Sequence, residues 1–165
     1  MVEVLSGSGG NWRVIDEITD STVIKQQDKV SCGHACAEML LKDRGIDDVN
    51  QSRIADETGV PVNTKSLGIA LNKLDYSGSR VWLSGSVAIP EATYSEIIDV
   101  LMSTGSWAAI LWEPLADLGH MVVVDRLDNR GKIQIRDPWM ATRYKMDREE
   151  FINYWNLQAI YSLRR

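Results

Sequence analysis

The chain has 165 residues, of which 44% are apolar and 25% are charged, and its 18 basic and 23 acidic side chains give a net charge of −5. This composition is typical of one soluble globular domain and excludes a largely disordered chain. The sequence has no apolar run of about 18 residues and does not start like a secretory signal, so we expect no membrane segment. An acidic chain without a basic stripe is also not expected to bind nucleic acid.

Residues 5–10 read Leu-Ser-Gly-Ser-Gly-Gly, which is the composition of a flexible linker. We therefore expect a linker and N-terminal segment at residues 1–11, followed by a single domain at residues 12–165. Short strands are predicted at 12–15 and 23–24, at the start of this domain.

The first half of the domain is predicted to be mainly helical. Apolar residues recur at the spacing of one helix face after Cys32, and Gly45 provides a stop signal. Asn63 or Thr64 provides an N-cap for a later helix. Helices are expected at residues 32–44, 51–57 and 65–74.

The second half is predicted to be rich in strands. A turn at Asp128-Asn129-Arg130-Gly131 joins two of them into a hairpin. Helices are expected at residues 93–103 and 147–155, and strands at 80–83, 107–112, 121–127, 132–136 and 157–163. Helices followed by an antiparallel sheet predict an α+β domain.

Only two cysteines are present, which excludes a scaffold of disulfides. Cys32 falls at the first turn of a predicted helix, where free N–H groups and the helix dipole favour a thiolate. Cys36 lies one turn later on the apolar face and is expected in the core. Gln26 precedes Cys32 by six positions and can place an amide donor beside it, where an oxyanion would form. Gln27 is the alternative donor.

The two histidines are His34 and His120. His34 is expected on the surface of its helix, whereas His120 begins a predicted strand. Asp137 ends the next strand of the same hairpin, so antiparallel pairing would bring its carboxylate to the His120 ring. A thiolate nucleophile needs such a base and a group that orients the base. Two other interpretations remain open: a turn begun by Asp137, and a zinc site made of Cys32, His34, Cys36 and His120.

These residues, in this order, resemble those of papain-like cysteine peptidases. The pattern QxxxxxCGxAC at 26–36, with GHxVVV at 119–124 and DPW at 137–139, is most similar to the bacterial double-glycine leader peptidases of bacteriocin export. The resemblance implies a papain-like fold, with an N-terminal helical part whose nucleophile helix packs on a C-terminal antiparallel sheet.

The resemblance also implies roles for particular residues. Cys32 would be the nucleophile, His120 the general base and Asp137 the residue that orients His120. Gln26 and the Cys32 backbone N–H would hold the oxyanion, and Trp139 would shield the His–Asp pair from water. No metal or organic cofactor is implied. The six tryptophans are otherwise expected to pack, with Trp107, Trp112 and Trp155 in the core.

The expected function is a cysteine peptidase that acts on a protein or peptide substrate. Because the sequence contains no membrane segment, we expect a bacterial effector or toxin domain that is secreted by a specialised system rather than an exporter domain. It would act in the cytoplasm of a target cell and be opposed by an immunity protein. The alternatives are a deamidase or transglutaminase, a leader-peptide-processing domain, and an inactive domain that binds peptides.

Overall fold

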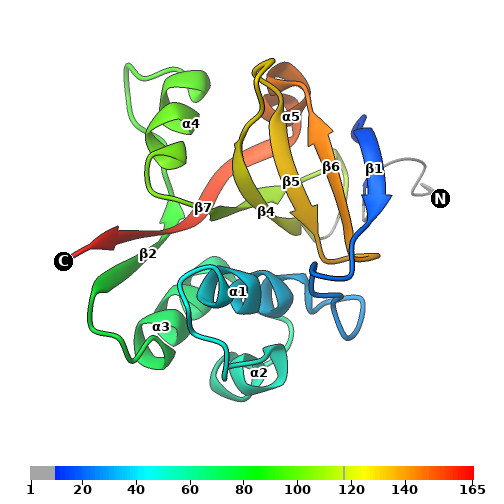
Figure 1. The fold of residues 1–165 in the computed structure, drawn as a ribbon. Helices are drawn as coiled ribbons and strands as arrows, with labels where there is room; N and C mark the ends of the chain where they lie inside the picture. The colour runs from blue at the N-terminus through cyan, green and yellow to red at the C-terminus, as the bar shows by residue number, and fades with distance from the viewer. Residues whose placement is uncertain (1–9, 117) are drawn as a thin grey trace.

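The computed structural model describes residues 10–116 and 118–165, which form a seven-stranded antiparallel sheet with helices on both faces (Figure 1). The strand order is β1-β6-β5-β4-β3-β7-β2. The helices are α1 (Cys32–Lys42), α2 (Gln51–Thr58), α3 (Thr64–Leu74), α4 (Tyr94–Met102) and α5 (Arg148–Tyr154). The strands are β1 (Ile15–Thr19), β2 (Arg80–Ser86), β3 (Trp107–Leu111), β4 (His120–Leu127), β5 (Ile133–Asp137), β6 (Thr142–Met146) and β7 (Trp155–Arg164).

The central strands separate two cores. Met121 and Val123 of β4 face the cluster made with α1, α2 and α3, whereas Val122 and Val124 face the cluster made with α4 and α5. Successive side chains of a strand point to opposite faces, so a strand covered on both faces is apolar throughout. This arrangement confirms the predicted α+β class and the packing of the α1 helix on the sheet.

Local signals account for most of the element boundaries. Asn63 caps α3 by accepting a hydrogen bond from the backbone N–H of Ser66, and Thr93 forms a capping box with Glu96 at the start of α4. Gly45 follows α1 with a φ of 85°, a left-handed conformation that favours glycine. The predicted helices are therefore confirmed, with ends that differ by one or two residues.

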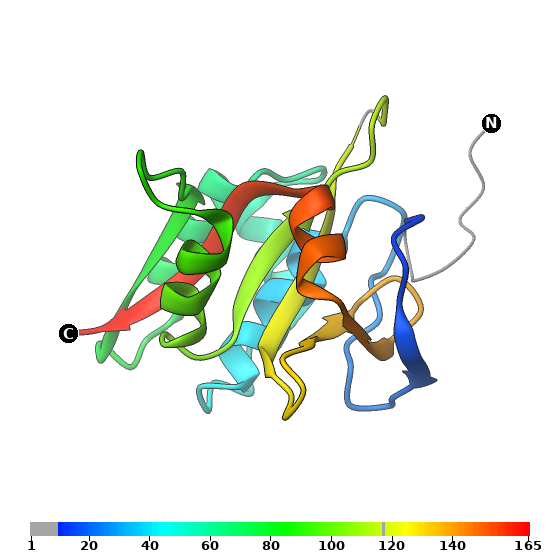
Figure 2. The same ribbon diagram turned by 90° about the horizontal axis from the view of Figure 1, so that it is seen from above.

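The predictions at the sheet edge were less accurate. Residues 23–24 form no strand, and the first strand is Ile15–Thr19 rather than 12–15. β1 is an edge strand with mostly exposed side chains, so it carries no apolar alternation. The sequence analysis missed β6, in which buried Thr142, Tyr144 and Met146 alternate with arginine and lysine. Figure 2 shows β1 beside β6 at one end of the sheet, and β2 paired with the end of β7 at the other.

The expected linker lies mostly outside the described residues, since the structure describes the chain from Gly10 onward. Within the described residues, no helix combines the length and the apolar composition that a membrane crossing needs.

Arg136 of β5 links the C-terminal end of α1 to the sheet. Its Nε donates to Asp125 Oδ1 of β4 at 3.0 Å, and its Nη1 donates to Asp43 Oδ1, just beyond α1, at 3.1 Å. The Arg136 side chain is 8% exposed, against 30% for Asp43 and 22% for Asp125. Asp125 also pairs with Arg143, so loss of Arg136 would leave the partly buried Asp43 without its ion pair and Asp125 with one partner fewer.

Replacing Arg136 with Met should therefore lower the free energy of unfolding by about 2 kcal/mol, as measured by urea denaturation. Arg53→Met is the matched control, because Arg53 forms an exposed i,i+4 pair with Glu57 on α2. We expect a loss of about 0.5 kcal/mol for this control. Equal losses in the two variants would contradict the anchoring role of Arg136.

Candidate active site

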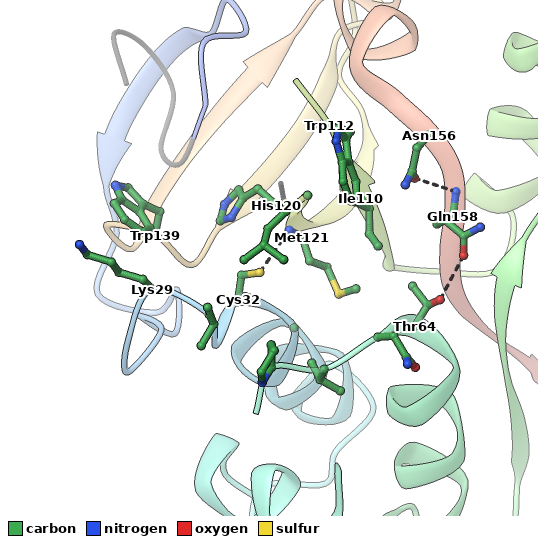
Figure 3. A pocket seen from close by; sticks show the side chains of 17 residues that line it. Lys29, Cys32, Thr64, Ile110, Trp112, His120, Met121, Trp139, Asn156 and Gln158 are labelled. Carbon is green, nitrogen blue, oxygen red and sulfur yellow. Dashed lines mark hydrogen bonds between the residues drawn. The ribbon is translucent and has the colours of Figure 1, made fainter. Parts of the chain in front are cut away.

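A cleft of about 560 Å³ opens where the N-terminal end of α1 meets the start of β4 (Figure 3). One wall comes from the segment before α1 and from the loop between α2 and α3. The opposite wall comes from the end of β3, the start of β4 and the start of β7. Cys32, His120 and Trp139 all line this cleft, so three residues singled out by the sequence lie in one cavity.

Cys32 is the first residue of α1, as predicted. The N-cap residue Ser31 forms no side-chain cap, and its hydroxyl instead donates to Asp28 Oδ1. The first N–H groups of α1 are therefore not used by a capping side chain, and the positive end of the helix dipole lies at the thiol. The backbone N–H of Met121 donates to Cys32 Sγ at 3.4 Å.

These contacts change the acidity of the thiol. Burial alone raises the pKa of Cys32, but the hydrogen bond and charge of His120 lower it, as do the N–H groups of Met121 and Gly33. The net result is a Cys32 pKa below its ordinary value. Cys32 therefore favours the thiolate form, which is the reactive form of cysteine.

His120 begins β4, and its Nε2 lies 2.7 Å from Asp137 Oδ1. Burial disfavours the charged ring, but the Asp137 carboxylate and then Cys32 raise the pKa of His120 to about 10. Because Nε2 faces Asp137, Nδ1 is the ring nitrogen that remains for Cys32. The three side chains thus favour a thiolate–imidazolium pair supported by a carboxylate.

The side chain of Asp137 is completely buried at the end of β5. Its Oδ1 also accepts the backbone N–H of Trp139 at 2.9 Å, and its Oδ2 accepts the Tyr144 hydroxyl at 2.6 Å. A buried carboxylate needs such donors, because an unsatisfied charge is costly away from water. The predicted approach of Asp137 to His120 across the hairpin is confirmed.

Gln26 is buried beside the site but does not line the cleft. Its backbone N–H donates to the carbonyl of Pro138 at 2.8 Å, and its side-chain Nε2 donates to the carbonyl of Asp28 at 2.7 Å. Gln27 instead donates its side-chain amide to Ser52 on α2. The structure thus places Gln26, and not Gln27, next to the Asp137 segment, while its oxyanion role stays a prediction.

Two tryptophans, Trp139 and Trp112, line the cleft. The Trp139 ring meets the His120 ring edge to face, with centroids 6.5 Å apart and planes at 88°. Trp107 and Trp155 are core residues as predicted, but the prediction for Trp112 was wrong. Trp112 lies just beyond β3, is 38% exposed and lines the cleft instead of packing inside.

The other cysteine and histidine lie away from the cleft. Cys36 is fully buried, as predicted, and its Sγ donates to the carbonyl of Met121 at 3.3 Å. The surface prediction for His34 was wrong, since this residue is 1% exposed and its Nε2 contacts Thr58 Oγ1 and the carbonyl of Gly59. Within residues 10–116 and 118–165, no His, Cys, Asp and Glu side chains group as a metal site requires.

The sequence analysis missed two residues of the site, Tyr144 and Trp12. Tyr144 reaches Asp137 from the neighbouring strand, and the buried Trp12 donates its Nε1–H to the Tyr144 hydroxyl at 3.0 Å. The alternation of β6 was the available signal for a buried Tyr144. Its hydrogen bond depends on the pairing of β5 with β6, which no local pattern shows.

Comparisons with known proteins agree with this geometry. Residues 18–162 match the family described as Peptidase_C39 like. The chain is 40% identical over 155 residues to Cysteine protease effector 1 of Escherichia coli O1:K1:H7. That match covers 94% of this chain but only 29% of the relative, which is a much longer protein.

The fold of this chain is similar to those of solved peptidase structures. One is a double glycine motif protease from an AMS/PCAT transporter, solved in complex with the leader peptide, with a TM-score of 0.64 and 18% identity over 98% of this chain and 97% of that chain. Another is the peptidase domain of Streptococcus ComA, a bifunctional ABC transporter of a quorum-sensing pathway, with a TM-score of 0.61 and 16% identity over 86% of this chain and 97% of that chain.

The match over residues 18–162 identifies the family, and the fold of the solved structures agrees with it. The chain belongs to the Peptidase_C39 like family and is a cysteine peptidase domain with a papain-like α+β fold.

Proposed function

We propose that Cys32, His120 and Asp137 form the catalytic triad of this peptidase. The observation that carries the proposal is that Cys32 and His120 line one cleft, with the buried Asp137 carboxylate 2.7 Å from His120 Nε2; the lowered pKa of Cys32 and the raised pKa of His120 agree with it. In such an arrangement the sulfur attacks, the histidine moves protons and the carboxylate fixes the ring.

The reaction follows from these positions. The Cys32 thiolate attacks the carbonyl carbon of the scissile peptide bond, and the carbonyl oxygen becomes an oxyanion. The His120 imidazolium then gives its proton to the leaving amine, which yields a thioester on Cys32. Neutral His120 next takes a proton from water, and the resulting hydroxide attacks the thioester to release the acid and the thiolate.

We place the oxyanion beside the backbone N–H of Cys32 and the side chain of Gln26. The Gln26 amide has two hydrogens, of which one serves the carbonyl of Asp28. The second is the donor that we assign to the oxyanion. The Cys32 N–H is one of the first N–H groups of α1, which have no partner inside the helix.

The cleft suits an extended peptide segment. Its wall near Cys32 is apolar and includes Val62, Ile110 and Trp112, whereas its far end carries a hydrogen bond of 3.1 Å from Thr64 to Gln158. Gly119 lies so close to Ile110 and Trp112 that a side chain at this position would collide with both. Gly119, just before His120, therefore packs directly against the apolar wall of the cleft.

For the cell, we propose that this domain is the peptidase part of a secreted bacterial effector that cleaves a protein in a target cell. The 40% identity to a protein named as a cysteine protease effector supports this role. A toxic peptidase also needs an inhibitor in the cell that makes it, so we expect an immunity protein as partner.

The thiolate–imidazolium pair predicts fast alkylation of Cys32 below its ordinary titration range. Labelling by iodoacetamide should persist at pH 6–7, whereas in His120→Ala it should rise only near about pH 8.5, the pKa of a free cysteine. Labelling is followed by mass spectrometry of the intact protein. Cys32→Ala is the control, because the remaining Cys36 is 0% exposed and should not react. An unchanged profile in His120→Ala would refute the pairing.

If Gln26 donates to the oxyanion, its loss should lower the rate of peptide cleavage but not the rate of Cys32 alkylation. Gln26→Ala should lower kcat by about 100-fold or more, because one donor to the oxyanion is lost. The alkylation rate of Cys32 should stay within about twofold, since iodoacetamide forms no oxyanion. Gln27→Ala is the matched control and should retain kcat. If Gln26→Ala retains full activity, the assignment of Gln26 is wrong.

Incubation with a bacterial lysate distinguishes the possible reactions. The wild-type domain should create new protein N-termini, detected by mass spectrometry of labelled termini, and Cys32→Ala should create none. A mass increase of about one dalton at glutamine, without new termini, would instead identify a deamidase. Neither change, despite fast alkylation of Cys32, would favour a domain that only binds peptides.

A further inference from the structure

We propose that Tyr144 and Trp12 are positioning residues for the catalytic His–Asp pair, so that the segment before β1 is part of the active-site support. This inference rests on the proposed function, since it concerns how Asp137 and His120 are held. Its main observation is a continuous chain of hydrogen bonds from Trp12 through Tyr144 to Asp137 and His120.

The direction of this chain is determined by its chemistry. An indole nitrogen only donates, so the Trp12 Nε1–H makes the Tyr144 oxygen an acceptor. The single hydroxyl hydrogen of Tyr144 must then point to Asp137 Oδ2. Burial and the adjacent Asp137 carboxylate raise the pKa of Tyr144 well above its ordinary value, so the hydroxyl keeps this hydrogen. Trp12 thereby orients Tyr144 as a donor to the carboxylate.

The two carboxylate oxygens of Asp137 have different hydrogen-bond partners. Oδ1 faces His120 and the N–H of Trp139, while Oδ2 accepts the Tyr144 hydroxyl. Without the hydroxyl, a fully buried carboxylate oxygen would lose a strong donor. The carboxylate would then turn towards other donors and lose its alignment with His120 Nε2. Tyr144 therefore acts on the reaction through Asp137, not by touching substrate.

Trp12 also contacts His120 directly. The two rings stack, with centroids 6.0 Å apart and planes at 17°, and the Trp12 side chain is buried. An indole face stabilises a nearby cation, here the imidazolium that the mechanism requires. A single residue of the N-terminal segment thus contacts the catalytic histidine and orients the donor to its carboxylate.

The segment that carries Trp12 is anchored on both sides of this residue. The backbone N–H and the side-chain amide of Asn11 both donate to the Glu113 carboxylate, in the loop beyond β3. The backbone N–H of Arg13 donates to Glu150 Oε2 of α5 at 2.6 Å. Gly10 lies against the Trp12 ring, where any side chain would collide with the indole. Displacement of residues 10–13 would therefore remove Trp12 from both His120 and Tyr144.

Other titratable and charged groups also surround the pair, so the test must isolate one hydroxyl. They are Cys32 and Cys36 of α1, Arg136 of β5, and Glu17 of β1, which lies near Tyr144. Tyr144→Phe leaves all of them in place and removes one hydroxyl, which is the donor to Asp137 and the acceptor of the Trp12 Nε1–H. Trp12→Phe removes the indole N–H but keeps an aromatic ring beside His120.

In the full chain, Tyr144→Phe should lower kcat about tenfold with KM within about twofold, and Trp12→Phe should lower kcat in the same direction. Both variants should slow the alkylation of Cys32 at pH 6.5 about tenfold and shift its pH profile upward, because a poorly held Asp137 supports less imidazolium. Tyr161→Phe of β7 is the matched control for loss of a hydroxyl and should leave both rates unchanged.

The outcomes separate this inference from the proposed function. Wild-type kcat and alkylation profiles in both variants would overturn the positioning role. If the wild type cleaves nothing, the alkylation profile still reports on the His120–Cys32 pair and tests the inference alone. If Tyr144→Phe fails to fold, the kcat and the alkylation profile of Trp12→Phe test the positioning role instead. Gly10→Ala, which displaces the indole while every polar group is kept, should then reproduce the slower alkylation, and a wild-type rate would reject the role.

Discussion

The architecture depends on one buried negative charge. Asp137 is completely shielded from water, yet it must remain a carboxylate to hold His120. Such a charge is tolerated only where donors surround it, and those donors come from β4, β6 and the segment after β5. Strand pairing, the position of Trp139 and the packing of Tyr144 can all be understood as ways of satisfying this group.

The opposite face of β5 carries a buried positive charge that also needs partners of opposite charge. Arg136, adjacent to Asp137 in sequence, points towards α1 and is neutralised by Asp43 and Asp125. Two consecutive residues of β5 therefore contact both sides of the site: Asp137 holds His120, and Arg136 holds the residue just beyond the far end of α1. The alternation of a strand makes this division possible.

Much of this could be predicted from the sequence because the signals were local or depended on residue order. The apolar periodicity of α1, the cap of α3, and the order of Cys32, His120 and Asp137 are all of this kind. β1, Tyr144 and Trp12 could not be found in the same way. Their positions depend on which strands pair and in which register, and His34 was misplaced because the α2 end that covers it is distant in sequence.

The hairpin turn at 128–131 has a consequence for the tolerance of the chain to insertions. It lies at the end of β4 and β5 opposite the cleft, where the backbone N–H of Asp128 donates to the carbonyl of Lys132. A side chain changes face with every residue of register, so one added residue that slid β5 by a single position would turn Asp137 away from His120. The length of a surface turn far from the cleft therefore governs whether Asp137 can reach His120, and length variation there should be selected against.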